Sequence, residues 1–98
     1  MRLNFFIGCN DKDTHAIKLS KNYCFEIIVN TFDRYFDSYT IQECYGIYKS
    51  ELEQSYQVSI LCDDYNFDMI RQLCDILKDK LNQECIGFEV IRNHYNFI

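Results

Sequence analysis

Apolar and polar residues alternate with a period of two in four segments of the chain. Over residues 2–9 every second side chain is apolar, from Leu3 to Cys9, while the positions between them are polar or mixed. This is the pattern of a strand with one buried face. The alternation recurs in three later segments, residues 39–50, 55–62 and 85–91. We therefore predict four strands.

Apolar residues recur at helical spacing in two further segments, residues 21–36 and 66–81, and each segment is predicted to form a helix. Ser20 precedes the first, and its hydroxyl suits the free amides of a helix start. Asp63 and Asp64 precede the second, where negative charge is favoured by the helix dipole.

Polar residues separate these elements. Asp37 and Ser38 are expected to end the first helix. Residues 51–54, Glu-Leu-Glu-Gln, are predicted to connect the second and third strands as a hairpin. Gly46 interrupts the second strand and indicates a β-bulge or a close approach of another backbone.

The predicted order of elements is β-α-β-β-α-β within a single domain of 98 residues. Two right-handed crossovers of this kind give a four-stranded antiparallel sheet with both helices on one face. The fold class is therefore α+β, a ferredoxin-like sandwich.

One face of such a sheet is left without helices. It is expected to present aromatic and apolar side chains, namely Phe6, Tyr48, Leu61 and either Cys44 or Tyr45. Contiguous apolar patches usually mark contacts, so we predict a homodimer formed sheet to sheet, or a docking face for another protein. The alternative is that the C-terminal tail, residues 94–98, folds across this face.

The formal net charge of −5 disfavours nucleic-acid binding, because affinity for phosphate backbones depends on Lys and Arg. No apolar run has the length of a membrane span, and residues 1–8 are too quickly polar for a signal peptide. We expect no membrane partner. Six cysteines are spread through apolar segments, which favours reduced thiols in a cytoplasmic protein.

Motifs for catalysis, metal binding and phosphate binding are weak. Cys9 and His15 flank the first loop and could form a thiolate–imidazole pair, but no third group is indicated to orient them. Because no Cys or His residues have close ligand spacing, we predict no metal site and no cofactor. The loop at residues 10–14 follows a strand, where ligand contacts are often found, although it lacks the glycine pattern of a phosphate cradle.

A short motif spans the second and third predicted strands. Gly46 and Tyr48 lead through a charged hairpin to a Glu-x-Ser strand at Glu53 and Ser55. In this motif, and in Leu-Asn-Gln-Glu at 81–84, the chain resembles a group of small bacterial and phage proteins of uncharacterised function. The resemblance implies a ferredoxin-like domain from a phage or mobile element, acting in the cytoplasm of a bacterial host, and implies no particular reaction.

Small size, acidity and weak catalytic motifs favour a protein-interaction module that is not an enzyme. The leading hypothesis is a phage-encoded inhibitor of a host defence system that binds a basic surface of a protein partner. The residues expected to bind this partner are acidic, aromatic or polar: Asp11, Asp13, Glu43, Tyr48, Glu51, Glu53 and Ser55.

Two alternatives are left open. One is a binder or sponge for a small nucleotide-like ligand, held at a dimer seam near the first loop. The other is a small dimeric enzyme of the ferredoxin-like kind, which would use Cys9, His15 or Tyr48. A ligand that binds only the folded protein would raise its melting temperature, which separates the sponge from the inhibitor.

Overall fold

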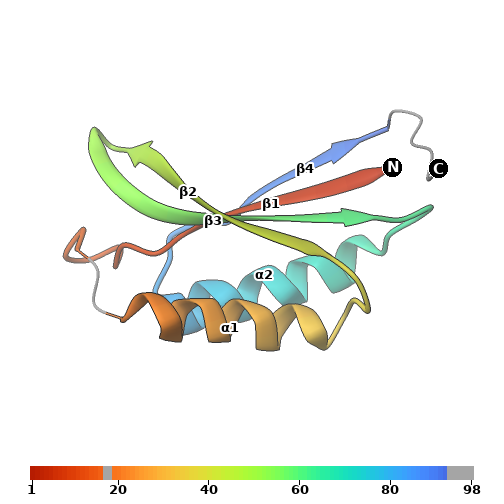
Figure 1. Cartoon of the computed structure of the whole chain (residues 1–98), viewed down its shortest axis with the longest axis horizontal. Helices are drawn as coiled ribbons and strands as arrows, with labels where there is room; N and C mark the ends of the chain where they lie inside the picture. Colours follow the sequence, from red (N-terminus) through yellow and green to blue (C-terminus); the bar gives the residue numbers. More distant parts are fainter. Residues whose placement is uncertain (17–18, 93–98) are drawn as a thin grey trace.

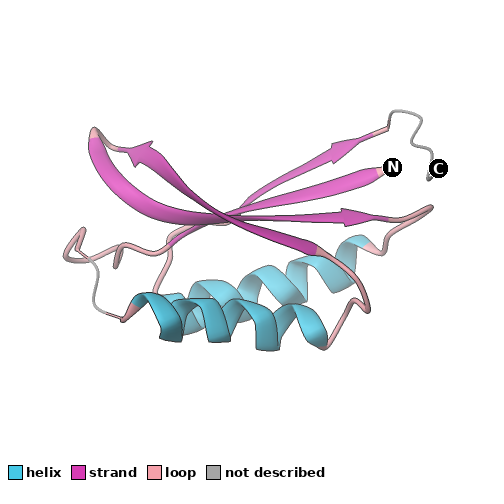
Figure 2. Ribbon diagram, in the orientation of Figure 1, coloured by secondary structure: helices cyan, strands magenta, loops and turns pink. Residues whose placement is uncertain are grey.

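Four strands form one antiparallel sheet in the order β2-β3-β1-β4, and both helices pack on one of its faces (Figures 1 and 2). The computed structural model describes residues 1–16 and 19–92. The elements are β1 (Arg2–Gly8), α1 (Lys21–Asp33), β2 (Thr40–Tyr48), β3 (Glu51–Leu61), α2 (Phe67–Leu81) and β4 (Gly87–Ile91). The predicted α+β, ferredoxin-like sandwich is confirmed.

The core lies between the sheet and the helices. The alternation of β1 directs Leu3, Phe5 and Ile7 into it, and all three are fully buried. The Phe5 ring contacts the Phe32 ring of α1 and the Phe88 ring of β4, each at 5.0 Å between centroids. These aromatic contacts tie the central strand to a helix and to an edge strand.

Both helices begin at capping side chains. The Ser20 hydroxyl accepts a hydrogen bond from the Tyr23 amide at 3.2 Å, as predicted for α1. For α2 the cap is Asn66, the residue at which the predicted helix began, and Asp63 and Asp64 precede it as expected. The Asn66 side chain accepts from the Met69 amide at 3.1 Å.

The first helix is three residues shorter than predicted. It ends at Asp33, and the Tyr35 and Phe36 amides then close a turn on the Phe32 carbonyl at 3.0 and 2.9 Å. Both aromatic side chains still pack against the core. The apolar residues keep their helical spacing beyond Asp33 because the turn that follows the helix packs the same face against the core.

The hairpin between β2 and β3 turns earlier than predicted. Its two turn residues are Lys49 and Ser50, with φ of 50° and 65°, and residues 51–54 belong to β3. The β2–β3 register runs without interruption through Gly46, which lies opposite Glu53. The predicted bulge at Gly46 is therefore absent. A close approach of another backbone is not found there either, because a Cβ atom would meet only the Ser55 hydroxyl, at 3.5 Å.

The last strand begins at Gly87, two residues later than predicted. The tail at 94–98, which was expected to cover the open face, lies outside the described residues. All six cysteines are free. Neither described helix is both long enough and apolar enough to cross a membrane.

Candidate functional site

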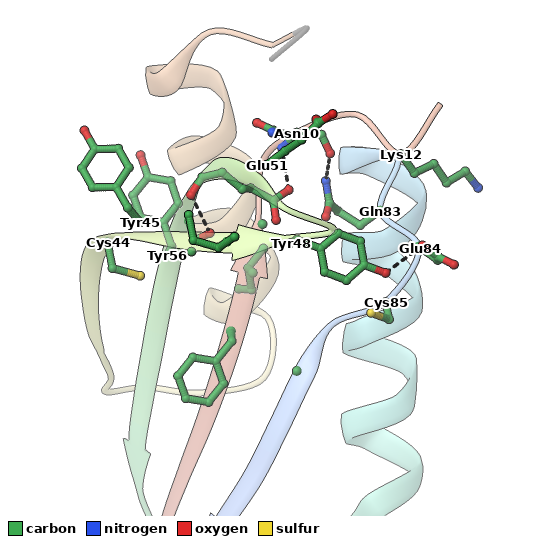
Figure 3. A pocket seen from close by; sticks show the side chains of 18 of the residues that line it. Asn10, Lys12, Cys44, Tyr45, Tyr48, Glu51, Tyr56, Gln83, Glu84 and Cys85 are labelled. Carbon is green, nitrogen blue, oxygen red and sulfur yellow. Dashed lines mark hydrogen bonds between the residues drawn. The ribbon is translucent and has the colours of Figure 1, made fainter. Parts of the chain in front are cut away.

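A pocket of about 410 Å³ opens on the sheet face that carries no helices. In Figure 1 the far end of the β2–β3 hairpin rises away from the helices, so this face is concave there. The pocket lies between that hairpin, the end of β1, the loop after β1 and the loop before β4. Figure 3 shows the labelled side chains that surround it, among them Tyr48, Glu51 and Gln83.

All three glycines of the chain line this pocket, and they come from three different strands. A Cβ atom on Gly87 would lie 3.1 Å from the Cβ of Phe6, and one on Gly46 would lie 3.5 Å from the Ser55 hydroxyl. A Cβ atom on Gly8 would collide with the Glu53 carboxylate. Because these three positions carry no side chain, the floor of the pocket is exposed backbone.

The Glu53 carboxylate lies directly over Gly8. Its Oε2 atom accepts a hydrogen bond from the Asn10 amide at 2.9 Å, which fixes the side chain across the end of β1. Gly8 pairs with Ser55 in the β1–β3 register. Glu53 is two residues before Ser55 on the same face of β3, so its side chain extends diagonally toward the end of β1. The contact needs glycine at position 8, because any larger residue would displace the carboxylate.

A second carboxylate stands beside the first. Glu51 and Glu53 are two residues apart on β3 and therefore point to the same face of the sheet. One oxygen of Glu51 lies 3.6 Å from Nδ1 of His15 in the loop after β1. Strand geometry thus places two carboxylates and an imidazole at one end of the pocket.

The hairpin tip is tied to the loop before β4. The Tyr48 hydroxyl donates to Oε2 of Glu84 at 2.9 Å, and the Lys49 ammonium lies 3.2 Å from the same atom (Figure 3 shows the first bond). The hydrogen bond from Tyr48, followed by Lys49, lowers the pKa of Glu84. That bond also raises the pKa of Tyr48. These contacts close one side of the pocket.

The two loops at the rim are joined to each other. The Asn82 side chain donates to the Asp11 carboxylate at 2.5 Å, and the Gln83 side chain donates to the Asn10 carbonyl (Figure 3). Asn82 has a left-handed conformation, with φ of 48°, where it ends α2. The end of α2 therefore sets the position of the loop after β1.

The structure brings together five of the residues that were predicted to bind a partner, which all line the pocket: Asp11, Tyr48, Glu51, Glu53 and Ser55. Glu43 lies on the opposite face of β2 and pairs with Lys21 at 2.7 Å. The predicted acidic set is therefore divided between two faces of the sheet.

Asp11 and Asp13 of the first loop were both predicted to bind a partner, and they differ in exposure. Asp11 is only 6% exposed, and its carboxylate accepts the Asp13 and Thr14 amides at 3.0 and 3.1 Å. The carboxylate is thus turned into its own loop, and a role of Asp11 in binding a partner stays a prediction. Asp13 is exposed and accepts a hydrogen bond from Asn82 at 3.1 Å.

Sequence reasoning missed several residues of the site. Gln83 and Asn10 were not identified as site residues, and Gly8 and Gly87 were not recognised as parts of one floor. The available signal was that the three glycines fall near strand ends or on strands, but only the register shows that they face one pocket.

The thiol of Cys9 is unsuited to act as a nucleophile. Burial, followed by the neighbouring Cys24 thiol, raises its pKa, so the reactive thiolate is disfavoured. His15 approaches Glu51 instead of forming a pair with Cys9. Within residues 1–16 and 19–92, no group of three or more His, Cys, Asp or Glu side chains is arranged to hold a metal ion.

Fold and site define a ferredoxin-like α+β domain with a carboxylate-bearing pocket on its open sheet face. No protein-family model matches the chain, and no curated protein matches its sequence. Among solved structures it is similar to a phage SAM lyase in the apo state, with 14% identity and a TM-score of 0.52 over 90% of this chain and 78% of that one.

The same similarity holds for the phage SAM lyase in complex with S-methyl-5′-thioadenosine. Identity is 17% and the TM-score 0.53, over 89% of this chain and 76% of that one. The de novo designed protein Foldit4 is also similar, with 15% identity and a TM-score of 0.49 over 93% of this chain and 97% of that one. At these identities the likeness is one of fold.

These neighbours correct the prediction that the chain is not an enzyme. Two of the solved structures that share its fold are those of a lyase, so neither the fold nor the weak motifs exclude catalysis. The physical reason is that catalysis by positioned charges needs side chains brought together in space. Such an arrangement leaves no short motif in the sequence.

Proposed function

We propose that the chain is an enzyme that binds S-adenosylmethionine (SAM) in the open-face pocket and cleaves it to S-methyl-5′-thioadenosine. The observation that carries the proposal is the pocket itself. It combines a backbone floor, aromatic walls and two adjacent carboxylates, Glu51 and Glu53. The fold shared with a phage SAM lyase that binds S-methyl-5′-thioadenosine supports this choice of ligand.

Charge favours a cationic ligand over a phosphorylated one. Glu51 and Glu53 are the carboxylates that face the pocket, because Asp11 is turned into its own loop and Glu84 pairs with Lys49. SAM carries a positive sulfonium and a positive ammonium group, which such a pocket attracts. Nucleotide phosphates would be repelled, so the nucleotide-like ligand expected from the sequence is better described as a nucleoside without phosphate.

Aromatic side chains suit both parts of this ligand. Phe6 and Tyr48 are each 43% exposed and line the pocket. Aromatic rings attract sulfonium-type cations through their faces and provide flat apolar surfaces for an adenine. The volume of about 410 Å³ falls within the range of small-molecule sites, about 300–1,000 Å³.

The proposed cleavage breaks the bond between the sulfonium sulfur and the γ-carbon of the amino-acid chain. Both electrons of that bond remain on sulfur, which becomes the neutral thioether of S-methyl-5′-thioadenosine. The γ-carbon, which has lost its bond to sulfur, can form a new bond by two routes that need no water. The substrate's own carboxylate oxygen can bond to it and close a lactone, or a carboxylate such as Glu53 can take a proton from the neighbouring carbon, leaving a double bond.

The role assigned to Glu53 and Glu51 is to bind and orient the cationic part of the substrate. Glu53 is already fixed by the Asn10 amide, so little reorganisation is needed when the substrate binds. Loss of the sulfonium charge in the reaction weakens the attraction to these carboxylates. The neutral product therefore leaves more readily than the substrate.

The test is incubation of the purified protein with SAM, followed by detection of S-methyl-5′-thioadenosine by mass spectrometry. Wild type and Glu43→Gln, a control on the opposite sheet face, are expected to form it. Glu53→Gln is expected to lose at least about tenfold in rate, the factor for a 1.4 kcal/mol interaction. The proposal is wrong if wild type forms no product, or if Glu53→Gln and Glu43→Gln are equally active.

The protein-binding role of the acidic residues stays a prediction. The division of Glu43 from Glu51 and Glu53 between two faces gives a basic partner no single acidic surface to bind. The buried position of Asp11 removes a further carboxylate from that surface. A pull-down from a host lysate that recovers a partner, and that partner's loss with Glu51→Gln, would support the inhibitor hypothesis over the enzyme.

A further inference from the structure

One row of the open sheet face consists of uncharged residues and lies next to the charged end of the pocket. Gln57, Phe6 and Gly87 are direct cross-strand partners on β3, β1 and β4, and all three line the pocket. The carboxylates of Glu51 and Glu53 lie further along β3, toward the hairpin. The pocket therefore has a neutral part and a charged part.

The Phe6 ring leans over Gly87. A Cβ atom at position 87 would lie 3.1 Å from the Cβ and 3.4 Å from the Cδ2 of Phe6, whereas ordinary cross-strand Cβ atoms are about 4.5–5.5 Å apart. The ring thus occupies space that a side chain would otherwise fill. Because 43% of Phe6 is exposed, its ring offers a flat apolar surface on which a planar base can stack.

The Gln57 amide differs from the other amide side chains of the pocket. Among the described residues that line the pocket, three carry amides: Asn10, Gln57 and Gln83. Asn10 donates to the Leu52 carbonyl at 3.2 Å, and Gln83 donates to the Asn10 carbonyl. Within residues 1–16 and 19–92, the half-buried side chain of Gln57 has no hydrogen-bond partner. Its two polar groups are therefore available to a ligand.

We propose that the row of Gln57, Phe6 and Gly87 binds the adenine of the substrate, with the base stacked on Phe6 and its edge recognised by the Gln57 amide. Gln57 is then the residue that makes the pocket select adenine. This inference rests on the proposed function, because it takes the ligand to be an adenine nucleoside.

The amide of glutamine matches the edge of adenine with both of its groups. The carbonyl oxygen accepts a hydrogen bond from the exocyclic amine of the base, and the NH2 group donates to N7. Hypoxanthine, the base of inosine, has an oxygen in place of that amine, so one of the two hydrogen bonds is lost. We therefore expect a preference for adenine of about tenfold, within the range for one bidentate contact.

The same row determines which way the substrate lies. Phe6 precedes Gly8 by two residues on β1, a separation of about 7 Å, and the Glu53 carboxylate lies over Gly8. The ribose of the substrate can span this separation, so a base on Phe6 places the 5′-sulfur near Glu53. The neutral base and the cationic sulfur then each meet the part of the pocket that suits their charge.

The next row of the open face is already closed by its own hydrogen bonds. The Ser59 hydroxyl donates to Oδ1 of Asn4 at 2.6 Å, and Nδ2 of Asn4 donates to Glu89 at 2.9 Å. Asn4 is only 4% exposed. Recognition of the base is therefore assigned to Gln57 and not to Asn4.

Binding of two nucleosides tests the assignment without catalysis. Isothermal titration calorimetry would measure Kd for S-methyl-5′-thioadenosine and for S-methyl-5′-thioinosine, its hypoxanthine counterpart. We expect wild type to bind the first about tenfold more tightly. Gln57→Leu should make the two Kd values equal. Gln42→Leu is the matched control and should keep the preference, because Gln42 lies opposite Gln57 on β2 but does not line the pocket.

A second pair of variants separates stacking from recognition of the edge. Phe6→Ala should weaken the binding of both nucleosides by about tenfold and keep their ratio, because stacking does not depend on the edge of the base. Phe67→Ala should change neither Kd, because Phe67, which is 55% exposed on α2, does not line the pocket. Circular dichroism would confirm that each variant folds.

A third nucleoside keeps the test independent of any substitution. The 7-deaza counterpart of S-methyl-5′-thioadenosine lacks the N7 acceptor, so wild type should bind it severalfold less tightly. Equal binding of this compound would contradict recognition by Gln57 even if Gln57→Leu does not fold.

The outcomes separate this inference from the proposed reaction. Equal Kd values for the adenine and hypoxanthine compounds in wild type, no binding of either at millimolar concentration, or a preference that Gln57→Leu retains would each overturn the adenine site, whatever the activity on SAM. A wild type that prefers the adenine compound, and loses this preference with Gln57→Leu, but forms no product from SAM would uphold the site and refute the lyase.

Discussion

Replacement of Gly8 by alanine gives the sharpest test of how the pocket is built. The new Cβ atom would occupy the position of the Glu53 carboxylate. Since that carboxylate is the end of a flexible side chain, it would move away while the strand stays in place. The movement breaks the hydrogen bond from the Asn10 amide, which is 2.9 Å long.

The magnitude follows from two opposing effects. Loss of a hydrogen bond to a charged group costs about 1.5–3 kcal/mol. Gly8 does not have a positive φ, so alanine fits the backbone, and its stiffer unfolded chain returns about 0.4–1 kcal/mol. The net loss of stability is about 1–2 kcal/mol. For a domain of this size this lowers Tm by roughly 4–16 °C.

The assay is urea unfolding followed by circular dichroism, with Gly46→Ala as the matched control. A Cβ atom on Gly46 would meet the Ser55 hydroxyl at 3.5 Å, an ordinary contact, so this control should change stability little. In a Glu53→Ala background, Gly8→Ala should lose its cost, because no carboxylate is displaced. Equal effects of the two glycine variants, or an undiminished cost in that background, would refute the reasoning.

Three further predictions concern the core, the hairpin contact and the thiols. Phe5→Ala should lower the free energy of unfolding by about 3–5 kcal/mol, measured in urea, because its ring is fully buried; a loss below 1 kcal/mol would contradict its central place in the core. Tyr48→Phe should raise the pKa of Glu84 toward 4.5, followed by carboxyl NMR, because the tyrosine hydrogen bond lowers it. The bond's small stabilisation should be present above pH 4.5 and disappear as the pH falls through the lowered pKa; an unchanged titration would contradict the contact. In the folded protein, iodoacetamide should label exposed Cys85 well before Cys74, whose burial raises its pKa to about 11; peptide mass spectrometry would detect the reverse order, which would contradict the burial.

The central strands could be predicted from the sequence because one face of each is buried. The alternation at Leu3, Phe5 and Ile7 gave β1, and that at Val58 and Ile60 gave most of β3. The hairpin could not be placed, because its turn residues carry neither glycine nor asparagine despite their left-handed backbone. The polar residues at 51–54 suggested a loop, although in β3 they alternate between the two exposed sides of the hairpin.

The site was predicted only in part. Tyr48, Glu53 and Ser55 were identified because they are close in the sequence and share one hairpin. Glu53 and Gly8 are 45 residues apart in the chain, so their contact depends on the register of β3 against β1, and pattern alone does not set that register. Charge composition likewise could not reveal that Glu43 lies on the other face.

The hydrogen bond between Asn82 and Asp11 has a consequence for the lifetime of the protein. Because the pocket is assembled from segments at residues 6–15, 44–57 and 83–87, global unfolding of the domain destroys it, and a ligand held there binds only the folded chain. A ligand at one hundred times its Kd would therefore protect the whole fold by about 2.7 kcal/mol. Proteases act mainly on opened chains, so loaded molecules would survive longer than empty ones, and the supply of ligand would set how much protein accumulates.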